Sequence, residues 1–213
     1  RLPVDGTFPF GVTTGMEEFL VRMVTEPEFV RRAVDAYVNR SLAWIDAFFD
    51  AGVDAVMPTD DYCDNRGPVM GPARFREFVL PGLVRQAEAA HARGGYFIKH
   101  TDGNVWSILD TFVEARVDAW HGIQPSIGMD LRLLKERYGS ALCFFGGVNC
   151  ETLVAGTPEE AAAEVRYAIH HAAPGGGLVV TTGNVLQPGT RLECYLAARA
   201  ATREYGAYPI ATE

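Results

Sequence analysis

The sequence predicts an α/β fold in which parallel strands alternate with helices, and three observations support this prediction. Short apolar runs recur along the chain, and longer segments with helical periodicity separate them. The apolar runs are nearly continuous, which is typical of parallel strands buried on both faces. Polar side chains follow the carboxyl ends of nearly all of these runs. Such an alternation favours a parallel sheet with right-handed crossovers.

Six apolar runs are predicted to be strands. They lie at Phe8–Thr13, Ala55–Thr59, Tyr96–His100, Ala119–Ile123, Leu142–Val148 and Leu178–Thr182. Two stretches, "DAGVDAV" at Asp50–Val56 and "EARVDAW" at Glu114–Trp120, share one pattern: a helix ends, a short turn follows and a strand begins. This repeated joint indicates βα units.

Seven segments between these strands are predicted to be helices. They span about residues 16–24, 27–50, 72–92, 104–115, 129–137, 158–171 and 190–204. The clearest start signal is "TPEE", a capping box with Thr157 as N-cap, Pro158 at the first helical position and Glu160 at the third. Pro27 and Pro72 mark two further helix starts in the same way.

Both a (β/α)8 barrel, or TIM barrel, and a doubly wound sheet fit this alternation, and the polar residues favour the barrel. They follow nearly every predicted strand: Thr13 and Thr14, Asp60 and Asp61, His100 and Asp102, Gln124, Asn149, and Thr182 with Asn184. Site residues from many strands are typical of a barrel, whereas an open sheet gathers them at one switch point. A complete barrel takes about 250 residues. We therefore expect residues 1–213 to form a single partial barrel domain with units three to eight, the first two units lying upstream.

Composition narrows the class of protein. The chain has 213 residues, 48% hydrophobic and 22% charged, with a formal net charge of −8. It has no Lys/Arg run, so neither nucleic acid nor a membrane surface is an expected partner, and no apolar run approaches the ~18–20 residues that span a bilayer. The four cysteines form no C-x-x-C pair, which favours reduced thiols and a cytoplasmic location. Trp44, Phe48 and Phe49 fit an oligomer interface as well as a core.

Two polar motifs follow predicted strands. In "PTDDYCDNRGP", adjacent residues of an extended chain point in opposite directions, so we expect one of Asp60 and Asp61 to face a site and the other to pack against a loop. In "KHTDGN", His100 and Asp102 are two residues apart and face one side if the strand continues. That spacing suits two ligands of one metal ion or a histidine held by a carboxylate, and equally a hydrogen bond that closes the strand. Asn104 follows as a candidate substrate contact.

The later strands contribute further candidate substrate-binding residues. His121 and Gln124 lie at or beyond the end of one strand, Asn149 follows "FFGGV", and Thr182 and Asn184 end the last strand region. The glycines before Asn149 let a ligand approach the backbone closely. His121 also fits a histidine that is satisfied at the rim of the core.

In this order, the motifs resemble the uroporphyrinogen decarboxylase (URO-D) superfamily, which also contains cobalamin-dependent coenzyme M methyltransferases. The resemblance covers about Asp60 to Tyr205. It rests on "DDYCDNRGPVMGPARFREFVLPGL", "GGYFIKHTDGNVWSILDTFVEARVDAW", "QPSIGMDLRLLKERYG", "FFGGVNCETLVAGTPEEAAAEV" and "PGGGLVVTTGNVLQPGT". It implies a (β/α)8 barrel, in agreement with the strand-end pattern.

The resemblance is nearer to the methyltransferase-like branch than to true uroporphyrinogen decarboxylase. In the methyltransferases, the loop matching "HTDG" is similar to His-x-Cys-Gly, and with a second cysteine in a late loop it holds zinc, which activates a thiol acceptor. The matching residues here are His100, Asp102 and Asn184. Both thiolates are replaced, so the resemblance implies an oxygen-rich site of His100 and Asp102, with Asp60 or Asp61.

True decarboxylases are similar in fold but differ at two matching positions. They carry a serine near Asp61 and a histidine near Asn184, and neither residue is present here. A polycarboxylated substrate would also need cationic groups, and Lys99 is the only cation near this acidic set.

The resemblance therefore implies an enzyme that moves a methyl group between a small methylated substrate and a corrinoid or thiol carrier. A divalent metal such as zinc would act as a Lewis acid, and a partner protein would carry the corrinoid. The implied catalytic residues are Asp60, Asp61, His100 and Asp102. Two alternatives stay open: a carboxy-lyase of the uroporphyrinogen decarboxylase type in porphyrin biosynthesis, and a barrel that binds a small molecule without catalysis.

Overall fold

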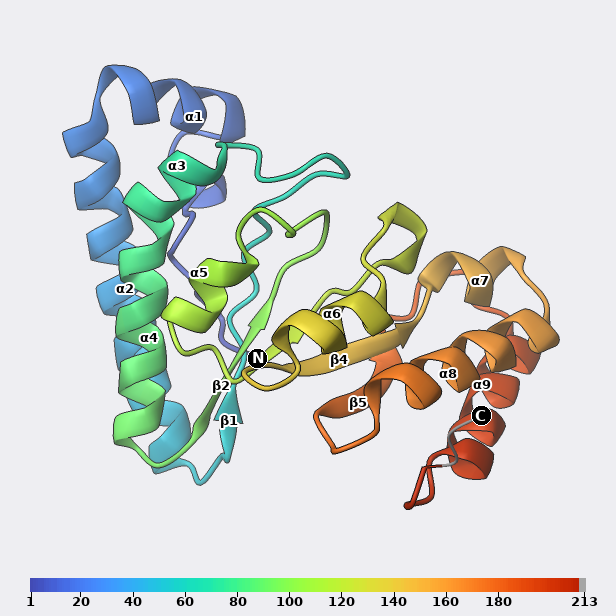
Figure 1. Ribbon diagram of the computed structural model, residues 1–213. Helices are drawn as coiled ribbons and strands as arrows, with labels where there is room; N and C mark the ends of the chain where they lie inside the picture. The colour runs from blue at the N-terminus through green and yellow to red at the C-terminus, as the bar shows by residue number, and fades with distance from the viewer. Residues whose placement is uncertain (211–213) are drawn as a thin grey trace. The chain divides into compact units, whose positions relative to one another are not determined.

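The computed structural model describes residues 1–210 and confirms the predicted α/β class (Figure 1). The chain divides into two compact units, one spanning Arg1–Asp118 and the other beginning at Ala119. In each unit the paired strands run parallel, as the continuous apolar runs predicted.

The first unit consists of a helical layer and one parallel strand pair. Its elements are η1 (Phe10–Val12), α1 (Met16–Thr25), α2 (Pro27–Asp50), β1 (Ala55–Val56), α3 (Pro72–Arg74), the π-helical turn η2 (Phe75–Val79), α4 (Leu80–Ala92), β2 (Tyr96–His100) and α5 (Leu109–Glu114). Strands β1 and β2 pair with Ala55 opposite Tyr96 and Val56 opposite Phe97. The predicted helix over 72–92 is one helical run, and its π turn lies just before Pro81, which has no N–H to donate to the preceding turn.

Helices α2 and α4 lie side by side (Figure 1) because each presents a buried stripe to the other. Val30, Val34, Val38 and Ile45 of α2 recur at helical spacing and are buried. Gly82 of α4 allows the close approach, since a Cβ atom there would lie 2.9 Å from Val38. Helix α4 of this layer also packs against β2.

The prediction of a strand at Phe8–Thr13 is wrong. The stretch contains the 3-10 helix η1, and its aromatic side chains pack in an aromatic cluster. The centre of the Phe8 ring lies 4.8 Å from that of Phe10 and 5.7 Å from that of Phe19. Pro9 removes a donor that a sheet ladder would need, and the Thr13 hydroxyl donates back to the Pro9 carbonyl at 2.9 Å. An apolar run this short does not distinguish a strand from a buried turn.

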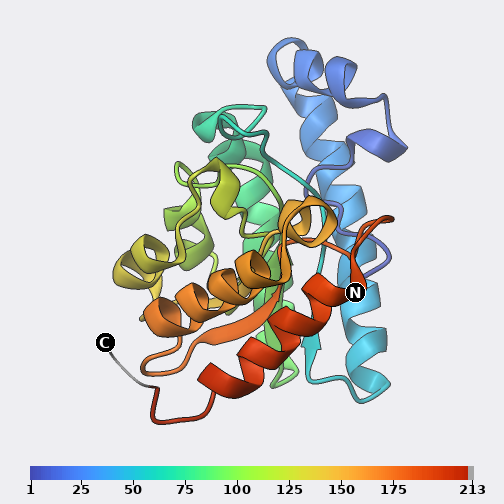
Figure 2. The ribbon, with the colours of Figure 1, turned by 90° about the vertical axis from the view of Figure 1, so that its right-hand side faces the viewer.

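The second unit is a three-stranded parallel sheet covered by helices. Its elements are β3 (Ala119–His121), η3 (Pro125–Ile127), α6 (Leu131–Tyr138), β4 (Cys143–Val148), α7 (Cys150–Ala155), α8 (Pro158–Ala172), β5 (Leu178–Thr182) and α9 (Leu192–Tyr205). Strand β4 is central and pairs with both neighbours. Figure 2 shows α8 and α9 side by side, and their buried residues share one core cluster with Val148 and Leu153.

The predicted capping box is confirmed at the start of α8. The Thr157 hydroxyl accepts from the Glu160 N–H at 3.2 Å, and the Glu160 carboxylate accepts from the Thr157 N–H at 2.8 Å. The short helix α7 was not predicted, because its six residues carry too little periodicity to detect. Within the part of the chain that is described, no helix combines the length and the apolar character needed to cross a membrane.

Candidate functional site

Asp61, His100 and Asp102 come together in the first unit. One ligand atom from each lies within 4.8 Å of the other two. The His100 Nε2 atom is 3.8 Å from Asp61 Oδ1 and 3.9 Å from Asp102 Oδ1. His100 is the last residue of β2, Asp102 follows it two residues later, and Asp61 comes from the loop after β1. The structure thus joins the two polar motifs that the sequence placed after neighbouring strands.

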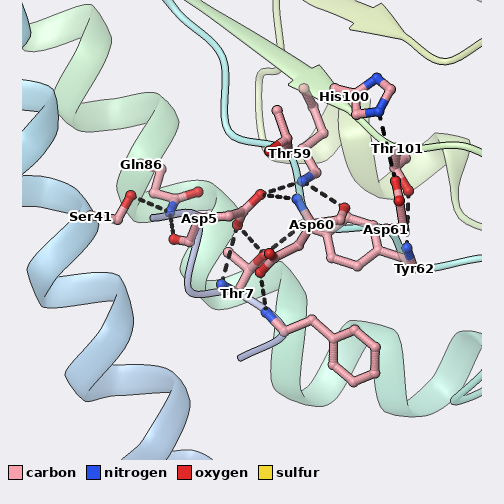
Figure 3. Close-up of polar contacts among 12 residues, drawn as sticks. Asp5, Thr7, Ser41, Thr59, Asp60, Asp61, Tyr62, Gln86, His100 and Thr101 are labelled. Atoms are coloured by element: carbon pink, nitrogen blue, oxygen red, sulfur yellow. Dashed lines mark hydrogen bonds and ion pairs between the residues drawn. The ribbon is translucent and has the colours of Figure 1, made fainter. Parts of the chain in front are cut away.

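Backbone contacts hold the two loops together. The Asp102 N–H donates to Asp61 Oδ1 at 3.1 Å. The Tyr62 N–H donates to the Thr101 hydroxyl at 3.0 Å (Figure 3). Gly103 adopts a φ of +89°, and a Cβ atom there would lie 2.6 Å from the Cys63 carbonyl oxygen. The glycine of "HTDG" is therefore required by a left-handed backbone and by the close approach of the 61–64 loop.

The donor set fits a divalent metal ion. One imidazole nitrogen and two carboxylate oxygens form a donor set that suits ions such as Zn²⁺ or Mn²⁺. This donor set differs from that of a thiolate-rich zinc site. Two ligands of one tetrahedral zinc lie about 3.3 Å apart, which is near the separations from His100 to the two carboxylates. Asp61 is 55% exposed at its side chain, whereas His100 is 11% exposed, so the group opens to solvent on the Asp61 side.

Asp60 points away from these three residues, as the alternation of an extended chain requires. Its carboxylate accepts from the Phe8 N–H at 3.0 Å, and its own N–H donates to Asp5 Oδ2 at 2.8 Å. Of the two adjacent carboxylates, Asp61 therefore faces the candidate metal site and Asp60 packs against the N-terminal loop. The catalytic role of Asp60 stays a prediction.

Behind the candidate metal site lies a buried charge network that the sequence did not reveal (Figure 3). The Lys99 ammonium donates to Asp5 and to the Asp60 carbonyl at 3.0 Å, and it lies 4.4 Å from the centre of the Tyr62 ring. Asp5 also accepts from the Thr7 hydroxyl at 2.5 Å. The side chains of Lys99 and Asp5 are 0% and 1% exposed. Lys99, the one cation that the sequence places near the acidic set, is thus a buried partner of Asp5.

Burial and neighbouring charge set the pKa values in this network. Burial opposes ionisation of Asp5, but the Lys99 charge and the hydrogen bonds from Asp60 and Thr7 outweigh it, so the Asp5 pKa lies below its ordinary value. Burial and then the negative charge of Asp5 raise the pKa of Asp60 to about 7. Burial also raises the pKa of Tyr62 well above its usual value. A sequence signal for the network did exist: Lys99 shares a strand face with buried Phe97.

The second unit brings three of the predicted substrate contacts together. Gln124, Asn149 and Asn184 line one cavity of about 400 Å³, within the usual range for ligand pockets. They follow β3, β4 and β5, so the carboxyl ends of three parallel strands supply them. The three amides form what we call the amide pocket.

The remaining predicted contacts are engaged in local structure. His121 donates from Nε2 to the Thr182 carbonyl at 2.9 Å, and burial lowers the pKa of His121, which favours the neutral ring. The Thr182 hydroxyl donates to the Asn184 carbonyl at 2.5 Å. In the first unit, Asn104 Oδ1 accepts from the Trp106 N–H at 3.2 Å, which shapes the loop before α5. Their roles in substrate binding stay predictions.

Fold and site together define an α/β protein with parallel strands and strand-end polar clusters. The family model described as Uroporphyrinogen decarboxylase (URO-D) matches residues 10–205. The chain belongs to the uroporphyrinogen decarboxylase family.

Comparisons with individual proteins agree with this family. Uroporphyrinogen decarboxylase from Neisseria meningitidis serogroup C (strain FAM18) is 26% identical over 173 residues, which cover 76% of this chain and 44% of that protein. The same enzyme from Mannheimia succiniciproducens is 25% identical over 82% of this chain and 48% of that protein. A solved methyltransferase from Methanosarcina mazei matches with a TM-score of 0.76 and 25% identity, over 90% of this chain and 54% of that structure. The chain therefore spans about half the length of the relatives it matches.

Proposed function

We propose that this protein is a methyltransferase-like enzyme in which Asp61, His100 and Asp102 hold a divalent metal ion, zinc being the first candidate. The reaction would move a methyl group between a small methylated substrate and a carrier, either a corrinoid on a partner protein or a thiol. The observation that carries the proposal is the convergence of three ligand atoms within 4.8 Å at the end of β2. The similarity to a solved methyltransferase supports it.

The chain's own residues have distinct tasks in this proposal. His100 and the two carboxylates supply the ligand atoms, and a bound ion would supply Lewis acidity toward the methylated heteroatom or the acceptor. The Asp102 N–H fixes one oxygen of Asp61, which keeps the loop after β1 beside β2. The buried pair of Lys99 and Asp5 contributes no net charge, so the ligand set keeps the negative character that a cation requires.

Metal analysis tests this proposal directly. We expect full-length protein purified without chelator to contain one divalent ion per chain, and the His100→Ala variant to lose it. His170→Ala, a histidine of α8 in the other unit, is the matched control and should keep wild-type metal content. Metal-free wild-type protein, or unchanged metal content in His100→Ala, would remove the proposed mechanism.

A second candidate function is decarboxylation of a polycarboxylated tetrapyrrole or smaller acid, as in porphyrin biosynthesis. The similarity of this chain to the uroporphyrinogen decarboxylases of Neisseria meningitidis and Mannheimia succiniciproducens favours it. The environment of Lys99 speaks against it, because the ammonium is buried and paired with Asp5. An assay of the full-length protein with uroporphyrinogen, with and without chelator, separates the two functions.

A barrel that binds a small ligand without turnover is the third candidate. Such a carrier would be stabilised against heat by its ligand while the ligand stays chemically unchanged.

For domain organisation, we propose one partial (β/α)8 domain over residues 1–213. We also propose a cytoplasmic protein that is able to form oligomers and has no nucleic-acid or membrane partner.

A further inference from the structure

The two residues on either side of His100 both contact the loop that carries Asp61. Lys99 precedes His100 in β2, Thr101 follows it, and both side chains are fully buried. Residues two apart in an extended chain lie on the same face. One face of this segment therefore reaches two points of the loop after β1. His100 and Asp61 are themselves two of the three candidate metal ligands.

Lys99 holds the peptide group before Asp61. Its ammonium donates at 3.0 Å to the carbonyl of Asp60, which belongs to the peptide that joins Asp60 to Asp61. The Oδ2 atom of Asp5 accepts from the Lys99 ammonium and also from the Asp60 N–H at 2.8 Å. The buried ion pair thus holds Asp60 at both its backbone N–H and its backbone carbonyl.

Thr101 holds the peptide group after Asp61. Its hydroxyl accepts at 3.0 Å from the Tyr62 N–H, which belongs to the peptide that joins Asp61 to Tyr62 (Figure 3). The Tyr62 ring is fully buried, and its hydroxyl shares a hydrogen bond with the Thr7 hydroxyl. Tyr62 is therefore held at its backbone and at its side chain.

These contacts set the direction of the Asp61 side chain. A peptide group is planar, so each residue has only two soft backbone angles, one toward each flanking peptide. When both flanking peptides are held, the Cα–Cβ bond of Asp61 takes a fixed direction. The Asp61 side chain is 55% exposed, so packing around it contributes little to its orientation. Apart from the Asp102 N–H that donates to its Oδ1 atom, the held backbone has to supply that orientation.

We propose that Lys99 and Thr101 are positioning residues that direct Asp61 toward a metal ion bound at His100, a step that rests on the metal site of the proposed function. Neither residue supplies a ligand atom. Each acts through a peptide group next to Asp61, and Asp5 supplies the charge that lets the Lys99 ammonium be buried. One short segment thus carries one ligand, His100, and orients a second. Replacing residues that orient a ligand typically weakens metal binding by about 10- to 100-fold.

Binding of Co²⁺ to metal-free, full-length protein tests the role of Thr101. Co²⁺ accepts ligand sets similar to those of zinc, and its visible absorption spectrum reports the coordination geometry. Thr101→Val keeps the shape of the side chain but leaves the buried Tyr62 N–H without its acceptor, which favours a turn of that peptide. We expect the Kd for Co²⁺ to rise at least about tenfold and the spectrum to change.

Two threonine variants serve as controls. Thr101→Ser keeps the hydroxyl and should restore the wild-type Kd and spectrum. Thr111→Val removes another buried threonine hydroxyl, one that donates to the Ile108 carbonyl in α5, and should bind Co²⁺ like the wild type.

A double variant tests the role of Lys99. Asp5→Asn combined with Lys99→Met removes both charges, so no buried ion is left unpaired. The asparagine oxygen can still accept from the Asp60 N–H, whereas the donor to the Asp60 carbonyl is lost. We expect the Kd for Co²⁺ to rise at least about tenfold here too. This variant keeps the test decisive if Thr101→Val does not fold.

Urea unfolding in chelator measures the stability of each variant separately from metal binding. A purely structural role would lower stability but leave the Kd and the spectrum of the folded protein unchanged, and that result overturns the proposal. Absence of Co²⁺ binding to the wild type overturns the metal site itself, and the positioning roles with it. Wild-type binding that is matched by both Thr101→Val and the double variant overturns the positioning roles alone.

Discussion

Replacing Asp5 with asparagine tests the buried charge network behind the candidate metal site. The substitution keeps the size and shape of the side chain and removes its charge. In the native protein, Asp5 accepts from the Lys99 ammonium, from the Asp60 N–H at 2.8 Å and from the Thr7 hydroxyl at 2.5 Å. The asparagine can accept through one oxygen only, and its NH₂ group must face one of these donors.

The expected loss of stability follows from the burial of both charges. Breaking a buried ion pair by removing one partner costs about 3–5 kcal/mol, because the remaining charge stays buried without compensation. Lys99 would keep the Asp60 carbonyl at 3.0 Å and the face of the Tyr62 ring. At pH 8 the Asp60 carboxylate, with its pKa of about 7, is ionised and supplies part of the missing charge. We therefore expect the low end of that range, about 3 kcal/mol.

Urea unfolding followed by tryptophan fluorescence and far-UV circular dichroism measures this loss. Asp46→Asn is the matched control, since Asp46 pairs with Arg93 at 3.2 Å but is 62% exposed. Exposed pairs contribute about 0–1 kcal/mol, so the control should unfold close to the wild-type midpoint. Chelator in all samples keeps metal binding out of the comparison.

The reasoning would be refuted by a small effect. If Asp5→Asn lowered the free energy of unfolding by less than about 1 kcal/mol, the Lys99 charge would have to be compensated elsewhere. The same conclusion would follow if Asp5→Asn and Asp46→Asn lost equal amounts.

Two further predictions concern the same unit. Because the pKa of Asp60 is raised, the native state binds a proton at this carboxyl more tightly than the unfolded chain does. The free energy of unfolding should therefore fall as pH rises from about 4 to about 7. The fall is at most about 1.4 kcal/mol per pH unit. Urea unfolding of metal-free protein across this range should show the fall in the wild type and not in Asp60→Asn; equal slopes would contradict it. Gly103→Ala should lose about 1–3 kcal/mol more than Gly94→Ala, because both glycines have positive φ but only Gly103 would press a Cβ against the Cys63 carbonyl. Equal thermal and urea midpoints for the two alanine variants would show that the loop at Cys63 moves aside without a cost in stability.

Local patterns predicted most elements of the fold. The strands at Tyr96–His100 and Leu178–Thr182 have the predicted bounds, and so does the helix at Pro27–Asp50. Continuous apolar runs and proline at helix starts are signals that a few neighbouring residues carry. The prediction of a strand at Phe8–Thr13 failed because the aromatic partners of Phe8, which are Phe19 and Tyr62, come from other parts of the chain.

The candidate metal site was predictable in part. His100 and Asp102 share a face at a strand end, and the pair was found from their spacing. The choice of Asp61 over Asp60 was left open, because alternation shows that the two diverge but not which one faces the site. Contacts of Asp60 with Phe8 and Asp5, distant in sequence, make that choice.

The sequence by itself determined the α/β class, the family resemblance and the polar residues at the strand ends, since these depend on periodicity and on short motifs. Only the tertiary structure decided that Lys99 is neutralised by Asp5, and that Asn149 is held by Glu164. Both outcomes depend on partners far along the chain: Asp5 is 94 residues from Lys99, and Glu164 is 15 residues from Asn149. A residue type limits which hydrogen bonds a side chain can make, and the fold selects which of them it makes.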